Sequence, residues 1–262
     1  MTRAPASFTD LRARTLSAVV MIAIGAGAIW AGGVLFVLAI AVVCALMGWE
    51  LARMLAPKAA FGQAEGIALG LALALLGAVY LVAAPLLSLA LLLATAILAG
   101  VMLGQRAVSV PYLALILFAG FGLIVLRADF GLLWVLWLVA LVIGSDVAGY
   151  FAGRILGGPK LWPRVSPKKT WSGTVAGWLL AAAIGAGFTG PLGAGAGLIV
   201  VSVLVAMAGQ AGDIAESAIK RHAGVKDSSN LIPGHGGVLD RFDAMIASAL
   251  MVLIMAQSGF LG

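Results

Sequence analysis

Five acidic side chains in the second half of the chain have spacings that suit metal and phosphate chemistry. Asp213 and Glu216 are three residues apart, and so are Asp240 and Asp243. Residues three apart share one face of an α-helix, so each pair presents two carboxylates in one direction. Asp146 ends an earlier apolar segment. Carboxylate oxygens, in a chain whose single cysteine lies elsewhere, favour Mg²⁺ as the bound ion.

Two explanations compete for these acids. Asp240 and Asp243 begin an apolar segment, and acids at the start of a helix interact favourably with the helix dipole. That explanation does not serve Asp213, which lies near the end of its apolar segment. Acids at the border of a membrane are costly unless they are paired or functional. We therefore expect acids from three helices to converge near one membrane surface.

The polar stretch at 152–170 carries a candidate anion site. Ser166 and Pro167 predict a helix start, with serine as N-cap and proline at the first helical position. Lys168 and Lys169 would then occupy the first helical turn, where a bound phosphate would explain two cations. The competing explanation, in which these lysines only set the topology and meet lipid headgroups, has equal weight at this point.

A second polar stretch at 211–243 combines the acids with basic residues and a glycine-rich turn at 233–237. Backbone N–H groups of such turns can approach a phosphate, although one turn alone is weak evidence. The combination indicates metal-assisted phosphoryl or nucleotidyl transfer on a membrane substrate. The basic and imidazole side chains of this stretch include Lys220, Arg221, Lys226, His235 and Arg241.

The composition shows what must position these residues. Hydrophobic residues make up 63% of the chain and charged residues 10%, against about 25% charged in a soluble domain. The bilayer is therefore its solvent. The runs without charged residues are 15–49, 66–105, 107–126, 130–145, 170–212 and 244–262.

A membrane-spanning helix needs about 20 residues, so each of the three longest runs holds two helices. Helix breakers lie near the middle of each, at Gly32-Gly33, Pro85 and Gly190-Pro191. The prediction is an all-α polytopic membrane protein with nine transmembrane helices. We divide it into an N-terminal region of about five helices (1–126) and a catalytic region of about four (127–262). Glu50, at a helix end, is the only acid of the first region that we expect to be buried.

The basic residues predict the orientation. With the N-terminus in the cytoplasm, 15 of the 16 lysines and arginines fall on the cytoplasmic side, and Arg127 is the exception. Nine spans then place Gly262 outside. The net charge of +6 follows from this asymmetry, so it does not indicate binding to nucleic acid.

Three stretches resemble a known family. Residues 217–243, SAIKRHAGVKDSSNLIPGHGGVLDRFD, resemble the signature of the phosphatidate cytidylyltransferase (CDP-diacylglycerol synthase) family. Residues 166–173, SPKKTWSG, are similar to a second family motif and depart from it at Ser172, where an acid is common. Residues 146–154 look like a third motif, and the resemblance is firm over 140–243.

The resemblance implies that the phosphate of phosphatidate attacks the α-phosphorus of CTP and that pyrophosphate leaves. It implies a Mg²⁺ site at Asp213, Asp240 and Asp243, with a second, monovalent cation left open. Catalytic roles fall to Asp240, Asp243 and Lys226. The candidates for binding the two substrates are Ser166, Lys168, Lys169, Thr170, Ser217, Lys220, Arg221, His235 and Arg241.

The expected partners are CTP, phosphatidate and membrane lipid, with a homodimer left open. We expect a bacterial cytoplasmic membrane protein whose site faces the cytoplasm. One alternative keeps CTP and changes the acceptor to a polyprenol or an ether lipid. Another is a secondary transporter, which would carry polar residues near the bilayer midplane in paired halves. The polar residues of this chain instead gather at one predicted surface.

Overall fold

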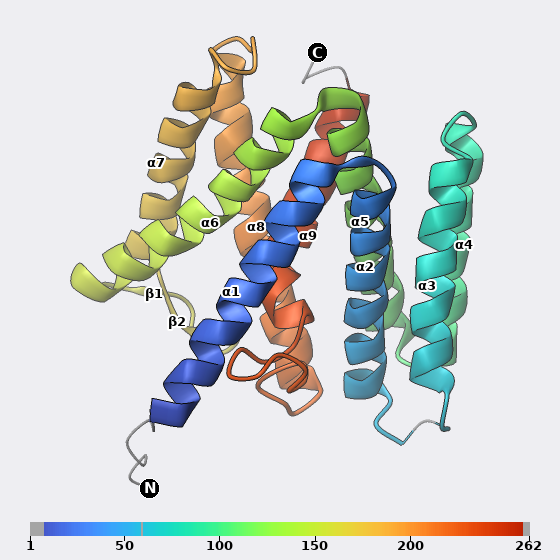
Figure 1. The fold of residues 1–262 in the computed structure, drawn as a ribbon. Helices are drawn as coiled ribbons and strands as arrows, with labels where there is room; N and C mark the ends of the chain where they lie inside the picture. Colours follow the sequence, from blue (N-terminus) through green and yellow to red (C-terminus); the bar gives the residue numbers. More distant parts are fainter. Residues whose placement is uncertain (1–7, 59, 259–262) are drawn as a thin grey trace, which may run out of the picture.

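The protein is an all-α, polytopic integral membrane protein (Figure 1). A computed structural model describes residues 8–58 and 60–258, so Arg3 and Gly262 lie outside the described residues. Nine α-helices occur in this part of the chain. They are α1 (Phe8–Ala31), α2 (Gly33–Leu55), α3 (Gln63–Tyr80), α4 (Pro85–Met102), α5 (Arg106–Val125), α6 (Leu132–Ile155), α7 (Trp171–Phe188), α8 (Gly197–His222) and α9 (Leu239–Gln257).

The number of α-helices among the described residues equals the nine predicted, but fewer of them meet the length and composition expected of a membrane span. Among the described residues, eight helices, α1 to α8, are long and apolar enough to cross a membrane. Helix α9 has 19 residues, and three charged side chains in its first turns lower its hydropathy. These are Asp240, Arg241 and Asp243, which the sequence assigns to the site.

The helices are divided where the sequence predicts. Gly32 lies between α1 and α2 with a φ of 62°, a left-handed conformation that glycine adopts without strain. Pro85 is at the start of α4, where a missing backbone N–H costs nothing. Gly190 and Pro191 lie in the turn between α7 and α8.

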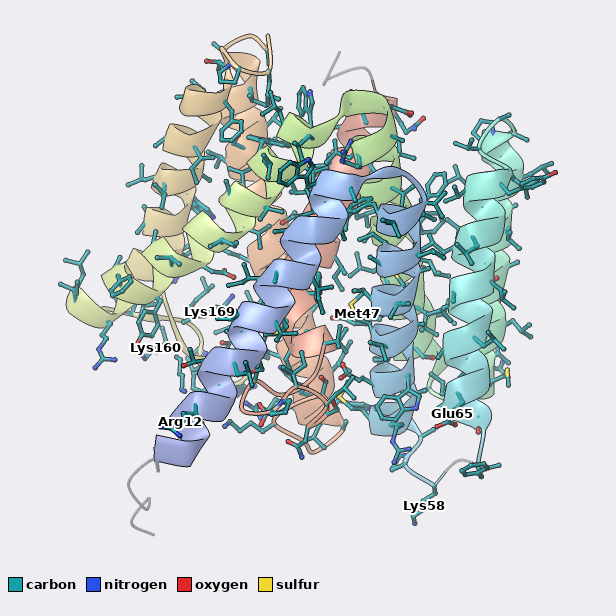
Figure 2. All side chains as sticks on the ribbon, viewed as in Figure 1. Arg12, Met47, Lys58, Glu65, Lys160 and Lys169 are labelled. Carbon is teal, nitrogen blue, oxygen red and sulfur yellow. The ribbon has the colours of Figure 1, made fainter. Side chains whose placement is uncertain are left out.

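One end of the bundle carries the polar segments. It holds the start of α1, the loop at 223–238 between α8 and α9, and a hairpin of β1 (Lys160–Trp162) and β2 (Ser166–Thr170) (Figure 1). We call it the polar end. The last turn of α9 lies at the opposite end of the bundle. Basic residues labelled at the polar end in Figure 2 include Arg12, Lys58 and Lys160.

Glycines let the helices of the second half approach closely, as is common in lipid. A Cβ at Gly173 of α7 would meet the backbone oxygen of Gly149 on α6. A Cβ at Gly212 of α8 would meet the backbone oxygen of Asp243 and the side chain of Ala247 on α9. The second contact brings the α8 segment that carries the site directly against the start of α9.

The predicted helix start at Ser166 is wrong. Ser166, Lys168 and Lys169 lie in β2, which pairs antiparallel with β1, and α7 begins at Trp171. Thr170 is the N-cap, because its Oγ1 accepts a hydrogen bond from the backbone N–H of Gly173 at 3.2 Å. The two lysines therefore precede the helix in a strand and do not sit in its first turn. Serine and threonine both serve as N-caps, and the pairing of Ser166 with Trp162 places Ser166 in the strand and leaves the cap to Thr170.

Arg127, the exception to the charge asymmetry, has a structural partner. It lies in a π-helical turn, η1 (Leu126–Phe130), at the end opposite the polar end. Its Nε donates to the carbonyl of Ile29 at 2.9 Å and its Nη2 to that of Trp30 at 3.2 Å. These carbonyls belong to the last turn of α1, where a cation also interacts favourably with the helix dipole.

We predict that Arg127→Met destabilises the protein by about 1–2 kcal/mol, because two carbonyls at the end of α1 lose their donor. Thermal unfolding of the purified protein in detergent, followed by tryptophan fluorescence, measures the change. Lys58→Met, in the exposed α2–α3 loop, is the matched control. Equal melting temperatures for the two variants would show that Arg127 does not anchor α1.

Candidate active site

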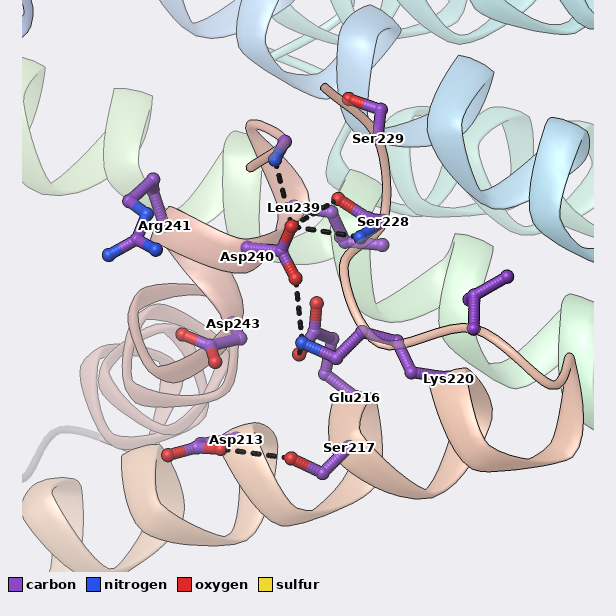
Figure 3. A network of polar contacts seen from close by, with 12 residues as sticks. Asp213, Glu216, Ser217, Lys220, Ser228, Ser229, Leu239, Asp240, Arg241 and Asp243 are labelled. Atoms are coloured by element: carbon purple, nitrogen blue, oxygen red, sulfur yellow. Dashed lines mark hydrogen bonds and ion pairs between the residues drawn. The ribbon is translucent and has the colours of Figure 1, made fainter. Parts of the chain in front are cut away.

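Helices α8 and α9 bring four of the five predicted acids together. Asp213 and Glu216 on α8 face Asp240 and Asp243 on α9 (Figure 3). Asp146 on α6 lies on the wall of a neighbouring cavity that Asp213 also lines. The sequence spacing therefore predicted which two acids share a face of each helix. The packing of α8 against α9 brings the two faces opposite each other.

The two carboxylate oxygens of Asp240 have different surroundings. Oδ2 accepts hydrogen bonds from the Ser228 backbone N–H at 2.8 Å, the Ser228 hydroxyl at 2.9 Å and the Gly237 backbone N–H at 2.8 Å. Oδ1 is paired with the Lys220 ammonium at 2.6 Å (Figure 3). Because Oδ2 is committed to the backbone, Oδ1 is the oxygen that a metal or substrate could use.

Lys220 connects the two helices. Its ammonium pairs with Asp240 on α9 and also with Glu216, one turn earlier on α8. Glu216 is fully buried, and apart from this ion pair neither of its oxygens has a hydrogen-bond partner among the described residues. Breaking a buried ion pair leaves an uncompensated charge, which is strongly destabilising. Lys220 therefore serves as the counter-ion of two acids at once.

A second lysine ties the hairpin to α8. The Lys169 ammonium, on β2, lies 2.5 Å from a carboxylate oxygen of Asp213. The other oxygen of Asp213 accepts a hydrogen bond from the Ser217 hydroxyl at 3.3 Å. The hairpin and α8 are thus joined by an ion pair at the level of the acid cluster.

A cavity of about 690 Å³ opens beside this ion pair, between α6, α7, α8 and the hairpin. Its size is within the range of small-molecule sites. Lys169 and Asp213 lie on its wall, so Asp213 belongs both to the cavity wall and to the acid cluster. The other polar side chains that line it are Ser145, Asp146, Tyr150, Arg154, Lys160, Lys168, Thr170, Thr174 and Gln210.

The glycine-rich turn is held in place by α1 and α9. The Ser17 hydroxyl of α1 lies 2.8 Å from Nδ1 of His235 and donates to the carbonyl of Pro233 at 3.0 Å. The Arg241 guanidinium donates two hydrogen bonds to the carbonyl of His235, at 3.0 and 2.7 Å. These contacts leave Nε2 of His235 as the imidazole nitrogen that could meet a ligand.

Other predicted residues lie farther out. Lys226 is exposed in the α8–α9 loop, and Arg221, also exposed, donates to the carbonyl of Val225 at 3.2 Å. Ser166 is at the start of β2, half-buried. The structure therefore groups the acids with Lys169 and Lys220, and places Lys168 and Thr170 on the cavity wall. It does not bring Lys226 to the acid cluster.

Ser172, where the chain departs from the family motif, has a local role. Its hydroxyl donates to the carbonyl of Gly157 and lies 3.0 Å from Oγ1 of Thr170. A carboxylate at this position could not donate to the carbonyl. The serine therefore closes the segment that precedes the hairpin against the start of α7.

Sequence reasoning missed the contacts of one acid. Glu50 on α2 is fully buried and accepts hydrogen bonds from the serines that precede the glycine-rich turn and from the start of α9. Its burial was predicted, but its partners were not. They lie at least 178 residues away in the sequence, so no spacing rule could find them.

The donor set has the chemistry that Mg²⁺ prefers, since it consists of carboxylate oxygens and contains no thiol. The buried oxygens of Glu216, which lack hydrogen-bond partners among the described residues, fit the same chemistry. Within residues 8–58 and 60–258, no three acidic, histidine or cysteine side chains are close enough to hold one ion. Lys169 and Lys220 are paired with Asp213 and Asp240, two of the carboxylates that are expected to hold the metal.

Comparison with known proteins identifies the family. Residues 12–258 match the model of the Cytidylyltransferase family, so this membrane-embedded chain belongs to that family. It is 38% identical to the phosphatidate cytidylyltransferase of Brucella suis biovar 1 (strain 1330), over 94% of this chain and 93% of that protein. It is 37% identical to the Helicobacter pylori (strain ATCC 700392 / 26695) protein of the same name, over 61% of both chains.

A further relative of the same name, from Bacillus subtilis (strain 168), is 39% identical over 45% of each chain. The predicted resemblance to the phosphatidate cytidylyltransferase family is thereby confirmed.

We predict that Gly237→Ala disrupts the site. A Cβ at this position would collide with the Ser228 hydroxyl, a hydrogen-bond donor to Oδ2 of Asp240, and with the Glu50 carboxylate. Forcing a methyl group into such packing costs about 1–3 kcal/mol, so thermal stability and turnover should both fall.

Gly195→Ala is the matched control, because a Cβ there meets nothing within 4 Å. Thermal unfolding and steady-state turnover of both variants, measured in the same detergent, would check the prediction. Wild-type turnover in Gly237→Ala would contradict the geometry described for Asp240.

Proposed function

We propose that this chain transfers the cytidylyl group of CTP to phosphatidate and thereby forms CDP-diacylglycerol and pyrophosphate. The observation that carries the proposal is the pairing of opposed carboxylates on α8 and α9 with lysines, beside a cavity lined by basic side chains. Family membership and the names of the relatives supply the two substrates.

The reaction needs charge neutralisation more than proton transfer. An oxygen of the lipid phosphate attacks the α-phosphorus of CTP, the bond between the α-phosphorus and the bridging oxygen breaks, and pyrophosphate leaves with the electron pair. The attacking phosphate is already an anion near neutral pH, so no general base is required. Positioning and electrostatic stabilisation dominate such transfers.

The basic wall of the cavity suits the phosphates of the two substrates. Arg154, Lys160 and Lys168 line it together with Lys169. Lys169 and Lys220 pair with Asp213 and Asp240 in the structure, and substrate phosphates would offer both lysines an alternative partner. In this proposal the cavity holds the triphosphate and the lipid phosphate next to the acids.

Asp213, Asp243 and Oδ1 of Asp240 would hold Mg²⁺. When bound, the ion would neutralise phosphate oxygens and polarise the reacting phosphorus. The support is the carboxylate chemistry of the cluster and the committed state of Oδ2, which leaves one oxygen of Asp240 for this role.

The proposed location is a bacterial cytoplasmic membrane, with the polar end facing the cytoplasm. The charge asymmetry supports it, because the predicted cytoplasmic side carries 15 of the 16 lysines and arginines. A soluble nucleotide substrate would then reach the cavity from the cytoplasm, and the lipid substrate would come from the membrane.

We predict that Asp240→Asn lowers Mg²⁺-dependent formation of CDP-diacylglycerol on the order of 100-fold or more. Asparagine must turn its NH₂ group either toward the N–H groups of Ser228 and Gly237 or toward the Lys220 ammonium, and donors oppose it in both orientations. Turnover of radiolabelled CTP with phosphatidate measures the loss.

Asp129→Asn, an exposed acid at the opposite end of the bundle, controls for the change of charge. Removing divalent ions with EDTA should stop the wild-type reaction, and adding Mg²⁺ back should restore it. Polyprenol and ether-lipid acceptors run beside phosphatidate identify the acceptor. Asp240→Asn turning over like the wild type would refute the assignment of the site.

Lys168→Ala should raise the KM for CTP or phosphatidate about tenfold, because one charged contact to a phosphate is lost from the cavity wall. Its effect on kcat should be smaller. Lys58→Ala removes the same charge from the polar end away from the cavity. Unchanged KM values in Lys168→Ala would show that this wall does not bind the substrates.

A further inference from the structure

A buried acid that the proposed chemistry does not use contacts the start of α9. Oε1 of Glu50 accepts hydrogen bonds from the Ser229 hydroxyl at 2.6 Å and the Val238 backbone N–H at 2.9 Å. Oε2 accepts from the Leu239 backbone N–H at 2.7 Å and lies 3.1 Å from the Ser228 hydroxyl, whose single proton it shares with Asp240. The side chain is fully buried.

The Glu50 carboxylate caps the N-terminus of α9, although it lies far from α9 in the sequence. The first N–H groups of a helix have no partner within it, and an anion there is also favoured by the helix dipole. Val238, the residue at the N-cap position of α9, makes no side-chain capping bond. Glu50 of α2 supplies the missing acceptor to the N–H groups of Val238 and Leu239.

The same turn holds Asp240. Three successive backbone N–H groups are shared between two carboxylates, with Gly237 donating to Asp240 and the next two residues donating to Glu50. The Ser228 hydroxyl lies within hydrogen-bond distance of both, 3.1 Å from Glu50 and 2.9 Å from Asp240. Glu50 therefore contacts residues next to both backbone N–H groups that bind Oδ2 of Asp240, those of Ser228 and Gly237.

We propose that Glu50 is a positioning residue for the reaction: by capping α9 it holds Asp240 with Oδ1 directed at Lys220 and the site. The inference rests on the proposed function. It also gives α2 a defined part in the site, since the residue that orients a predicted metal ligand of α9 comes from the first half of the chain.

Glutamine at position 50 separates this role from simple packing, because it preserves volume. Its amide has one accepting oxygen, so its NH₂ group must face one of the two donor pairs. A serine hydroxyl can rotate away, but the N–H of Val238 or Leu239 cannot. In either orientation one N–H at the start of α9 loses its acceptor. Aspartate keeps both oxygens on a shorter side chain.

The test compares Glu50→Gln and Glu50→Asp with Glu65→Gln, a control acid on α3 whose carboxylate accepts from Trp49 instead. We expect Glu50→Gln to lower kcat on the order of 10- to 100-fold, as loss of a partner that orients a metal ligand does. KM for phosphatidate should stay within about twofold, because the cavity wall is unchanged. Glu50→Asp should recover much of the loss, and Glu65→Gln should match the wild type.

A second readout does not depend on turnover. Mn²⁺, added alone to the purified proteins and followed by electron paramagnetic resonance, should bind more weakly to Glu50→Gln than to the wild type and Glu65→Gln. Thermal unfolding of each variant establishes that the compared proteins are folded.

The outcomes separate the two proposals. No CDP-diacylglycerol from the wild type would refute the proposed function itself. With an active wild type, unchanged kcat and Mn²⁺ affinity in Glu50→Gln would overturn the positioning role. The role would equally fail if Glu50→Gln and Glu50→Asp both lowered stability and kcat and also raised the KM for both substrates. That combination is the pattern of a purely structural residue.

Discussion

A carboxylate buried between apolar helices is stable only when cations and N–H donors surround it, and the region between α8 and α9 is arranged around this constraint. Lys220 is the counter-ion of Glu216 and Asp240, and Lys169 is that of Asp213. Backbone N–H groups saturate the second oxygen of Asp240. The close approach of α8 to α9 at Gly212 makes these pairings geometrically available.

The counter-ions connect structure to function. Lysine binds carboxylate and phosphate alike, so the lysines that hold the acids are also those that polyanionic substrates could engage. In the proposed function, Lys169 on the cavity wall and Lys220 between α8 and α9 would exchange a carboxylate partner for a substrate phosphate.

Charge-free runs and helix breakers predicted the helices, because a segment that crosses lipid must satisfy its backbone hydrogen bonds internally, as an α-helix does. The division at residue 126 remains a prediction. The N-cap of α7 was predicted at Ser166, but it is Thr170, because both residue types can cap a helix and only the pairing of β2 with β1 decides between them. Helical spacing predicted the paired acids of the site. The partners of Glu50 and the outward position of Lys226 depend on tertiary packing, which local spacing does not encode.

The most direct measurement follows the two ends of the CTP triphosphate through one reaction. Purified wild-type protein is incubated with phosphatidate and Mg²⁺, using CTP labelled at the α-phosphorus in one arm and at the γ-phosphorus in the other. Cytidylyl transfer predicts α-label in the lipid product and γ-label in pyrophosphate. γ-label in the lipid, as a CTP-dependent kinase would give, or no labelled lipid in either arm, would contradict the account.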